Sequence, residues 1–207
     1  MPWKLTSLFT PLMLTCSLAM AADIAADTAA KVATCNSCHA AENQQASKAP
    51  SLAGQQQQYL KKQLLQFQLG ERGAVAEDNS GQVMAAMAKP LSVDDIEQLS
   101  SYFSALPVVA PAVQQADIAL LDKGRRIYIG SCGACHGNKA QGNLELKAPA
   151  LNLLTQDYLL LQLQHFQSGV RGSTSTDKPG RQMAMMSRTL TEADRQAVVA
   201  YIGAGLP

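Results

Sequence analysis

The chain has 207 residues, of which 47% are hydrophobic and 16% are charged, and its formal net charge is +1. This apolar content excludes a disordered chain, and the absence of a triplet glycine period excludes a collagen-like one. The 17 basic and 16 acidic residues form no basic block, which excludes nucleic acid as a partner because neutralising phosphates needs a concentrated basic surface. Aromatic residues make up only 5% of the chain, so a buried cofactor would help to fill a core.

The N-terminal segment, residues 1–21, is predicted to be a cleaved secretory signal peptide. Lys4 gives a short positive start, residues 5–18 form an apolar run, and residues 19–21 match the small-x-small cleavage pattern. A membrane anchor is the alternative, but a span needs about 20 apolar residues, and this run is shorter and interrupted by Pro11. The mature chain is therefore expected in the periplasm, without a transmembrane segment.

The rest of the chain consists of two similar units. Lys-Ala-Pro occurs at 48–50 and again at 147–149, which sets an offset of 99 residues. Further pairs at this offset are Tyr59/Tyr158, Phe67/Phe166, Arg72/Arg171, Met84/Met183, Met87/Met186 and Tyr102/Tyr201. Two units are too few for a solenoid. They predict two domains, residues 22–106 and 117–207, joined by a linker over 107–116 that contains two prolines.

The hydrophobic spacing in each unit predicts helices. An alanine-rich segment over 24–34 precedes the first pair of cysteines, and residues 117–129, with spaced Leu and Ile, precede the second. Residues 55–69 place apolar side chains at i, i+4 and i+7, and the second unit repeats this spacing. No segment alternates over the length of a strand, so the expected fold class is all-α.

Two helix starts can be predicted from their capping pattern. Ser92 and Thr191 each precede an acidic residue three positions later, which approximates a capping box. The helix that follows Ser92 has Ile96 on its apolar face, where the second unit has Arg195. We therefore expect this turn of the second unit to be less buried.

A Cys-x-x-Cys-His string occurs in both units and carries the chemistry. It is the attachment signal of c-type haem: two thiols one helical turn apart can reach the two vinyl groups of a porphyrin, and the next imidazole can reach the iron. One all-cysteine zinc site or two redox dithiols are the alternatives, but neither requires a His after each second Cys. Two covalently attached haem c groups are therefore predicted. The residues are Cys35, Cys38 and His39 in the first unit and Cys132, Cys135 and His136 in the second.

Haem iron in an electron carrier takes a sixth ligand on the face opposite the His. The repeat offers two mirrored pairs of methionine, Met84/Met183 and Met87/Met186. Periodicity does not choose between them, because methionines at this spacing also fill a helix face. His165 aligns with Gln66 and has no counterpart in the first unit. Ligation by two histidines through His165 is an alternative, but a partly exposed structural histidine is favoured.

The ordered motifs resemble those of the cytochrome c4 family over essentially the whole mature chain. Each Cys-x-x-Cys-His is followed by Lys-Ala-Pro-x-Leu, by a Tyr-containing helix ending Phe-Gln-x-Gly-x-Arg-Gly, by Gly-x-x-Met-x-x-Met, and by Leu-Ser/Thr-x-x-Asp. The resemblance implies two tandem class I cytochrome c domains related by pseudo-twofold symmetry, with one haem in each. The second unit has a Ser/Thr-rich stretch over 173–176 where the sequence of the first unit is different, so the conformation of that loop is not predicted.

The resemblance also implies the residues around each iron. The first Met of each pair, Met84 or Met183, would be the axial ligand opposite His39 or His136. The proline after each haem motif would offer its carbonyl to the imidazole, an interaction that fixes the ring and tunes its basicity. Those prolines are Pro50 and Pro149.

Filled axial positions argue against an enzyme, because peroxidase or oxygen chemistry needs an open or displaceable position. The expected function is therefore periplasmic transfer of single electrons between respiratory-chain partners, toward a terminal oxidase. One alternative is the haem-bearing subunit of a periplasmic dehydrogenase complex. Another is a catalytic or gas-sensing di-haem protein, which would need one iron without its Met. Peripheral association with a membrane stays open.

Overall fold

The computed structural model describes residues 26–207, and the predicted signal peptide lies outside this range. The described part is helical, with a single isolated bridge between Asn143 and Ala148. The all-α prediction is thus confirmed. No helix between residues 26 and 207 combines the length and apolar character needed to cross a bilayer.

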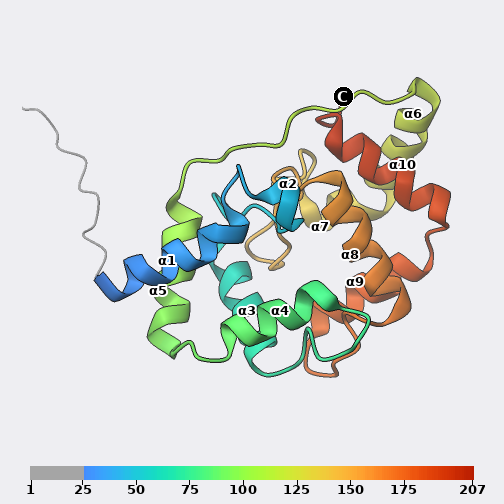
Figure 1. The fold of residues 1–207 in the computed structure, drawn as a ribbon. Coiled ribbons are helices and arrows are strands. Elements are labelled where there is room, and N and C mark those ends of the chain that lie inside the picture. Colours follow the sequence, from blue (N-terminus) through green and yellow to red (C-terminus); the bar gives the residue numbers. More distant parts are fainter. Residues whose placement is uncertain (1–25) are drawn as a thin grey trace, which may run out of the picture.

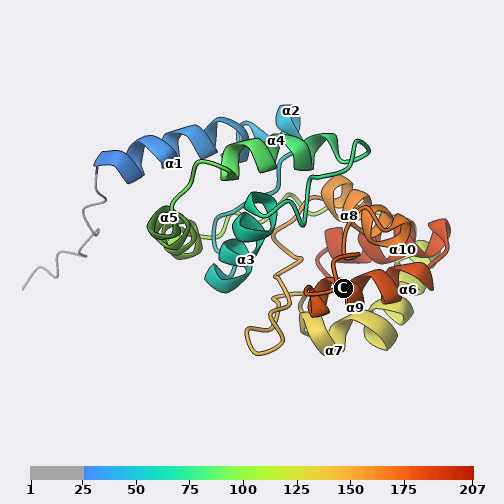
Figure 2. The same cartoon turned by 90° about the horizontal axis from the view of Figure 1, so that it is seen from below.

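The helices form two groups that lie side by side, connected by a segment without helix over 107–117 (Figure 1). The first group contains α1 (Ala26–His39), α2 (Gln44–Ser47), α3 (Gln57–Gln68), α4 (Asn79–Ala88) and α5 (Val93–Ala105). The second contains α6 (Ile118–Ile127), a π-helical turn (Tyr128–Cys132), α7 (Gly133–His136), α8 (Gln156–Ser168), α9 (Lys178–Arg188) and α10 (Glu192–Gly203). Seen from below, the groups occupy opposite sides of the molecule (Figure 2).

Each group packs its long helices in the same way. In the first group α3, which contains Tyr59, contacts α4 and α5. In the second group α8, which contains Tyr158, contacts α9 and α10. The first group buries Val32, Leu60, Leu99 and Phe103 together. The second buries a larger cluster that includes Tyr128, Leu159, Val198 and Tyr201. Each large apolar side chain buried in this way contributes about 1.5–3 kcal/mol to folding.

Side-chain caps define where the helices begin. Both predicted capping boxes are present, at Ser92 with Asp95 and at Thr191 with Asp194. Four further side-chain caps were not predicted: Asp78, Asp117, Thr155 and Asp177. The Asp78 carboxylate accepts a hydrogen bond from the Gly81 N–H (2.8 Å) at the start of α4, and Asp177 accepts one from Gly180 (3.0 Å) at the start of α9.

The expectation that the turn at Arg195 is less buried is wrong. Arg195 is only 7% exposed, against 0% for Ile96. The aliphatic stem of an arginine can pack like an apolar side chain, and the guanidinium Nη1 donates to the Leu190 carbonyl at 3.1 Å. Arg195 thus replaces Ile96 without opening the second group.

A ring of buried polar side chains joins the two groups. Arg72 donates through Nη1 to Gln63 Oε1 (2.8 Å) and through Nη2 to Gln162 Oε1 (2.9 Å). Arg171 mirrors it, donating through Nη1 to Gln162 (2.7 Å) and through Nη2 to Gln63 (2.8 Å). Each arginine also donates to the tyrosine of the other group, Tyr158 at 3.3 Å or Tyr59 at 3.0 Å. The contact therefore obeys the same twofold relation as the sequence repeat.

The loop over 173–176, whose course the sequence left open, also crosses to the first group. Thr174 Oγ1 donates to the backbone carbonyl of Glu71 (3.4 Å), and Thr176 Oγ1 donates to the Glu71 side chain (3.0 Å). The Ser/Thr-rich departure from the repeat thus supplies hydroxyl donors to the contact.

The environments of Asp78 and Asp177, the caps of α4 and α9, differ and so depart from the twofold relation between the groups. Asp177 accepts from Lys62 Nζ at 2.6 Å. Burial alone would raise the pKa of Asp177, but hydrogen bonds from Lys62 and Gln66 outweigh this effect and lower the pKa. The residue that mirrors Lys62 is a leucine, so Asp78 faces His165 instead, with Nδ1 3.8 Å from Oδ1.

His165 is buried, 8% exposed, so the prediction of a partly exposed histidine is wrong. The sequence signal was ambiguous because the position lies at a contact between the groups rather than on the outer face of α8. Neither His165 Nδ1 nor Asp78 Oδ2 has a hydrogen-bond partner within residues 26–207.

Replacing His165 by Gln, the residue at the mirrored position, should flatten the dependence of stability on pH below neutrality. Burial and the guanidiniums of Arg72 and Arg171 lower the pKa of His165 from 6.5, and Asp78 opposes them only in part. The unfolded chain then binds the proton more readily. The contribution of neutral His165 is therefore complete above pH 6.5 and is lost as the pH falls through the folded-state pKa.

Thermal unfolding of the two proteins at about pH 5 and about pH 7.5 measures this difference. The wild type should lose more stability than H165Q on acidification. Equal losses would show that protonation of His165 does not affect folding.

Candidate haem sites

Each histidine of the Cys-x-x-Cys-His strings lies at the end of a helix and is held by a proline carbonyl. His39 Nδ1 is 2.8 Å from the Pro50 carbonyl oxygen, and His136 Nδ1 is 2.9 Å from that of Pro149. A carbonyl can only accept, so Nδ1 carries the proton. The other ring nitrogen, Nε2, is then unprotonated, and its lone pair can coordinate a metal ion.

Both imidazoles are buried, and burial lowers their pKa, with the proline carbonyl opposing the shift. At neutral pH they are therefore neutral. Neutral imidazole is the form that binds metal ions, so protons do not compete with a metal for His39 or His136 at that pH.

In each pair one thiol is half-buried, Cys35 or Cys132, and the other is exposed, Cys38 or Cys135. Burial raises the pKa of Cys35, and it raises that of Cys132 to about 11. A redox dithiol needs a thiolate of lowered pKa, which argues against that alternative. Across residues 26–207 no three His, Cys, Asp or Glu side chains converge as metal ligands.

A π-helical turn, Tyr128–Cys132, leads into the second string and has no equivalent in α1. Tyr128 is 1% exposed, and its hydroxyl donates to the Gly137 carbonyl at 2.6 Å. Turns of this type are frequent at functional sites. This turn could not be predicted from the sequence, because its residues fit an α-helical pattern as well.

The methionine pairs lie in the second halves of α4 and α9, the helices that begin at the Asp78 and Asp177 caps. Met84 is half-buried and Met87 is 43% exposed. Met183 and Met186 are both half-buried. Burial thus favours Met84 over Met87 as the candidate ligand in the first pair, and it does not distinguish Met183 from Met186 in the second.

The donor set of each unit fits a haem c: two thiols on one turn, an imidazole with an unprotonated Nε2, and a thioether on a separate helix. The buried arginines supply a second test of fit. Among the described residues, Arg72 and Arg171 hydrogen-bond only to neutral groups, and Arg72 Nε has no partner. Buried charges are normally paired, and a haem carries two propionate carboxylates that could pair with them.

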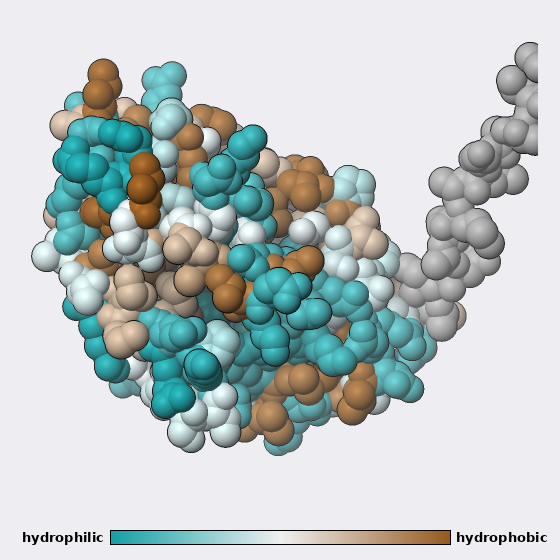
Figure 3. All heavy atoms as spheres, turned by 180° about the vertical axis from the view of Figure 1, so that it is seen from behind, coloured by the Kyte–Doolittle hydropathy of each residue, from teal (hydrophilic) through white to brown (hydrophobic). Residues whose placement is uncertain are grey.

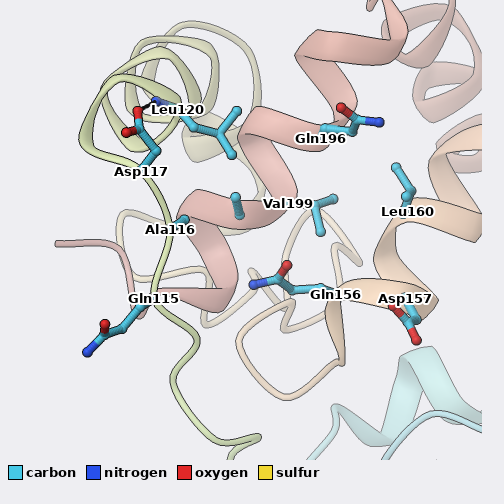
Figure 4. A pocket seen from close by; sticks show the side chains of 10 residues that line it. Gln115, Ala116, Asp117, Leu120, Gln156, Asp157, Leu160, Gln196 and Val199 are labelled. Carbon is cyan, nitrogen blue, oxygen red and sulfur yellow. Dashed lines mark hydrogen bonds between the residues drawn. The ribbon is translucent and has the colours of Figure 1, made fainter.

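A surface pocket of about 390 Å³ lies apart from these residues (Figure 4). It is lined from the connecting segment, α6, α8 and α10 by residues such as Gln115, Asp117, Gln156, Gln196 and Val199. None of the cysteines, histidines or methionines considered above lines it. On the face opposite to that of Figure 1, apolar residues occur in separate groups among hydrophilic ones (Figure 3).

Comparison with known proteins agrees with this geometry. The family model described as cytochrome c matches residues 25–107 and 121–205. Cytochrome c4 of Azotobacter vinelandii is 30% identical over 92% of this chain and 95% of that protein. The chain belongs to the cytochrome c4 family. The crystal structure of reduced recombinant cytochrome c4 from Pseudomonas stutzeri superimposes with a TM-score of 0.68, covering 87% of this chain and 97% of that one at 30% identity.

Membership of the cytochrome c4 family confirms the two tandem cytochrome c domains. The chain is a di-haem electron-transfer protein with one haem c in each domain, and the Cys-x-x-Cys pairs fit covalent attachment. A further relative, the thiosulfate dehydrogenase electron acceptor of Thiomonas intermedia, is 33% identical over 84% of this chain and 79% of that protein.

The purified cytochrome should have the mass of its polypeptide plus two haems. In C38A the first haem should keep a single thioether bond, because only Cys35 remains to bind it. The absorption band of the reduced haem in alkaline pyridine reports the number of thioethers, and about half of that absorption should shift. S37A changes the same motif without removing a thiol and serves as the control. A mass with one haem, or an unshifted band in C38A, would contradict the assignment.

Proposed function

We propose that His39 and Met84 bind the first haem iron and that His136 and Met183 bind the second. The single observation that carries this proposal is the duplicated orientation of the histidines, each with Nδ1–H bonded to a proline carbonyl, which leaves Nε2 unprotonated. The burial of Met84 relative to Met87 supports the first methionine of that pair. Met183 then follows from the repeat. Pro50 and Pro149 orient the imidazoles.

When bound, each haem supplies a one-electron couple of ferric and ferrous iron. The chain's part is to keep both axial ligands in place in both oxidation states, so that little structure changes on electron transfer. His39 and His136 are fixed by their carbonyl acceptors, and Met84 and Met183 lie on helices that are capped at their starts. With both axial positions filled, the protein is an electron carrier and not an enzyme.

The proposed role is to pass single electrons in the periplasm, from a respiratory donor toward a terminal oxidase. The signal peptide over 1–21, the domains over 22–106 and 117–207 and the linker over 107–116 belong to this proposal. The second candidate is the electron-transfer subunit of a periplasmic dehydrogenase complex. The similarity to a thiosulfate dehydrogenase electron acceptor favours it, and purification with a dehydrogenase at fixed stoichiometry would distinguish the two.

Spectroelectrochemical titration of M84H and M183H tests the ligands. A second imidazole lowers the reduction potential relative to a thioether, so each variant should lower the potential of one haem and leave the other nearly unchanged. The long-wavelength band of ferric haem with a sulfur ligand should fall by about half in each variant.

M87L and M186L are the matched controls and should keep both potentials and the full band. If M87L or M186L loses the band instead, the other sulfur of that pair is the ligand. A wild-type haem that lacks the band and binds carbon monoxide when reduced would indicate a catalytic or sensing site in that domain.

A further inference from the structure

Gln55 connects the two domains through a pair of buried hydrogen bonds. It precedes α3 in the first domain and is 1% exposed. Its Nε2 donates to the Ala150 carbonyl at 2.9 Å, and the Ala150 N–H donates to Gln55 Oε1 at 3.0 Å. The side-chain amide thus pairs with the backbone of a residue in the second domain, much as one strand pairs with another.

The Ala150 N–H and the Pro149 carbonyl belong to one peptide group. That carbonyl accepts the hydrogen bond from His136 Nδ1 at 2.9 Å. An unbroken series of hydrogen bonds therefore runs from Gln55, through a single peptide group, to the imidazole of His136.

The first domain has no mirrored version of this series. The residue that corresponds to Gln55 at the offset of 99 is Leu154, whose side chain has no polar atom and packs in the apolar core of the second domain. The bond from His39 to the Pro50 carbonyl is present, but Leu154 cannot support that peptide from across the interface. A side chain of the first domain thus bonds to the peptide that holds His136 in the second, and Leu154 of the second domain makes no such bond to the peptide that holds His39.

Hydrogen bonds in series polarise one another inside a protein. Accepting the Ala150 N–H draws charge toward the Pro149 carbonyl oxygen, which makes that oxygen a stronger acceptor for the Nδ1–H of His136. A stronger acceptor at Nδ1 makes the imidazole a more basic ligand and favours ferric iron.

We propose that Gln55 is a positioning residue for His136, which holds the reduction potential of the second haem below the value it would have without the contact between the domains. The proposal rests on the proposed role of His136 as an axial ligand. Under this proposal the reduction potential of the second haem depends on the contact between the domains, and that of the first haem does not.

Replacing Gln55 by Met keeps a side chain of similar length and removes both hydrogen bonds to Ala150. It also removes the hydrogen bond that Gln55 Oε1 accepts from the Gln56 N–H at 3.0 Å, which lies within the first domain. In Q55M the ratio of reduced to oxidised second haem, at a fixed applied potential, should rise about three- to tenfold, tenfold being 59 mV for a one-electron couple. The first haem should be unchanged. Repeating the substitution in the M183H background identifies which potential has moved. An unchanged second potential in a folded Q55M protein would overturn the proposal.

Q56M is the matched control. Gln56 is the next residue, and it lies at the same contact, beside Gly142 of the second domain. Its Oε1 has no hydrogen-bond partner among residues 26–207. A merely structural effect of loosening the interface should move both variants alike, and our proposal requires that only Q55M raise the second potential.

Proton exchange in the reduced wild-type protein gives a test that does not depend on any variant. The Ala150 amide and the His136 Nδ1–H should both exchange slowly, and in Q55M both should exchange faster while the His39 Nδ1–H does not. Rapid exchange of the wild-type Ala150 amide would overturn the proposal. Failure of the proposed ligation is distinguishable, because it would appear as a missing haem or a missing sulfur-to-iron band in the wild type.

Discussion

Two buried guanidiniums at the contact between the domains impose the strongest constraint on this structure. Arg72 and Arg171 lie within hydrogen-bond distance of the same two amide oxygens, those of Gln63 and Gln162. Each also stacks 4.5 Å from the centre of a phenylalanine ring in its own domain. These hydrogen bonds offset part of the cost of burying the two charges, and separating the domains would break the four that cross the contact. The twofold contact follows from the repeat because each domain supplies half of the acceptors.

Within that twofold frame, the duplicated sequence has diverged at the positions that face across the interface. Lys62 is matched by a leucine and Gln66 by His165, so one capping aspartate has a cationic partner and the other faces a neutral imidazole. Gln55 is matched by Leu154. These exchanges leave the helices and their caps intact, because capping depends on local residues. They alter what each domain offers to the other, and they add a second difference between the two units to that of the π-helical turn before the second Cys-x-x-Cys-His string.

Much of the fold could be predicted from the sequence because its determinants are local. The capping boxes at Ser92 and Thr191 and the apolar spacing in α3 and α8 act within a few residues, and the Cys-x-x-Cys-His strings identify their own chemistry. Burial at the contact between domains has no such local signature. His165, which lies at that contact, was expected to be more exposed than it is, since a polar residue on an amphipathic helix is usually on its outer face. Arg195 was also expected to be more exposed, but it is buried within the second domain, where it donates to the Leu190 carbonyl.

The same distinction separates what is predictable about each site from what is not. The resemblance to cytochrome c4 gives the order of ligands along the chain, and the proline carbonyls follow from it. The partner of the peptide after Pro149 is 95 residues away from Ala150 in sequence, and no spacing rule reaches that far. A polar side chain that pairs with backbone across an interface can be recognised only once the backbone is placed. The peptide that holds His136 in the second domain is thus bonded to a residue of the first domain, and the environment of that histidine is complete only when the two domains are in contact.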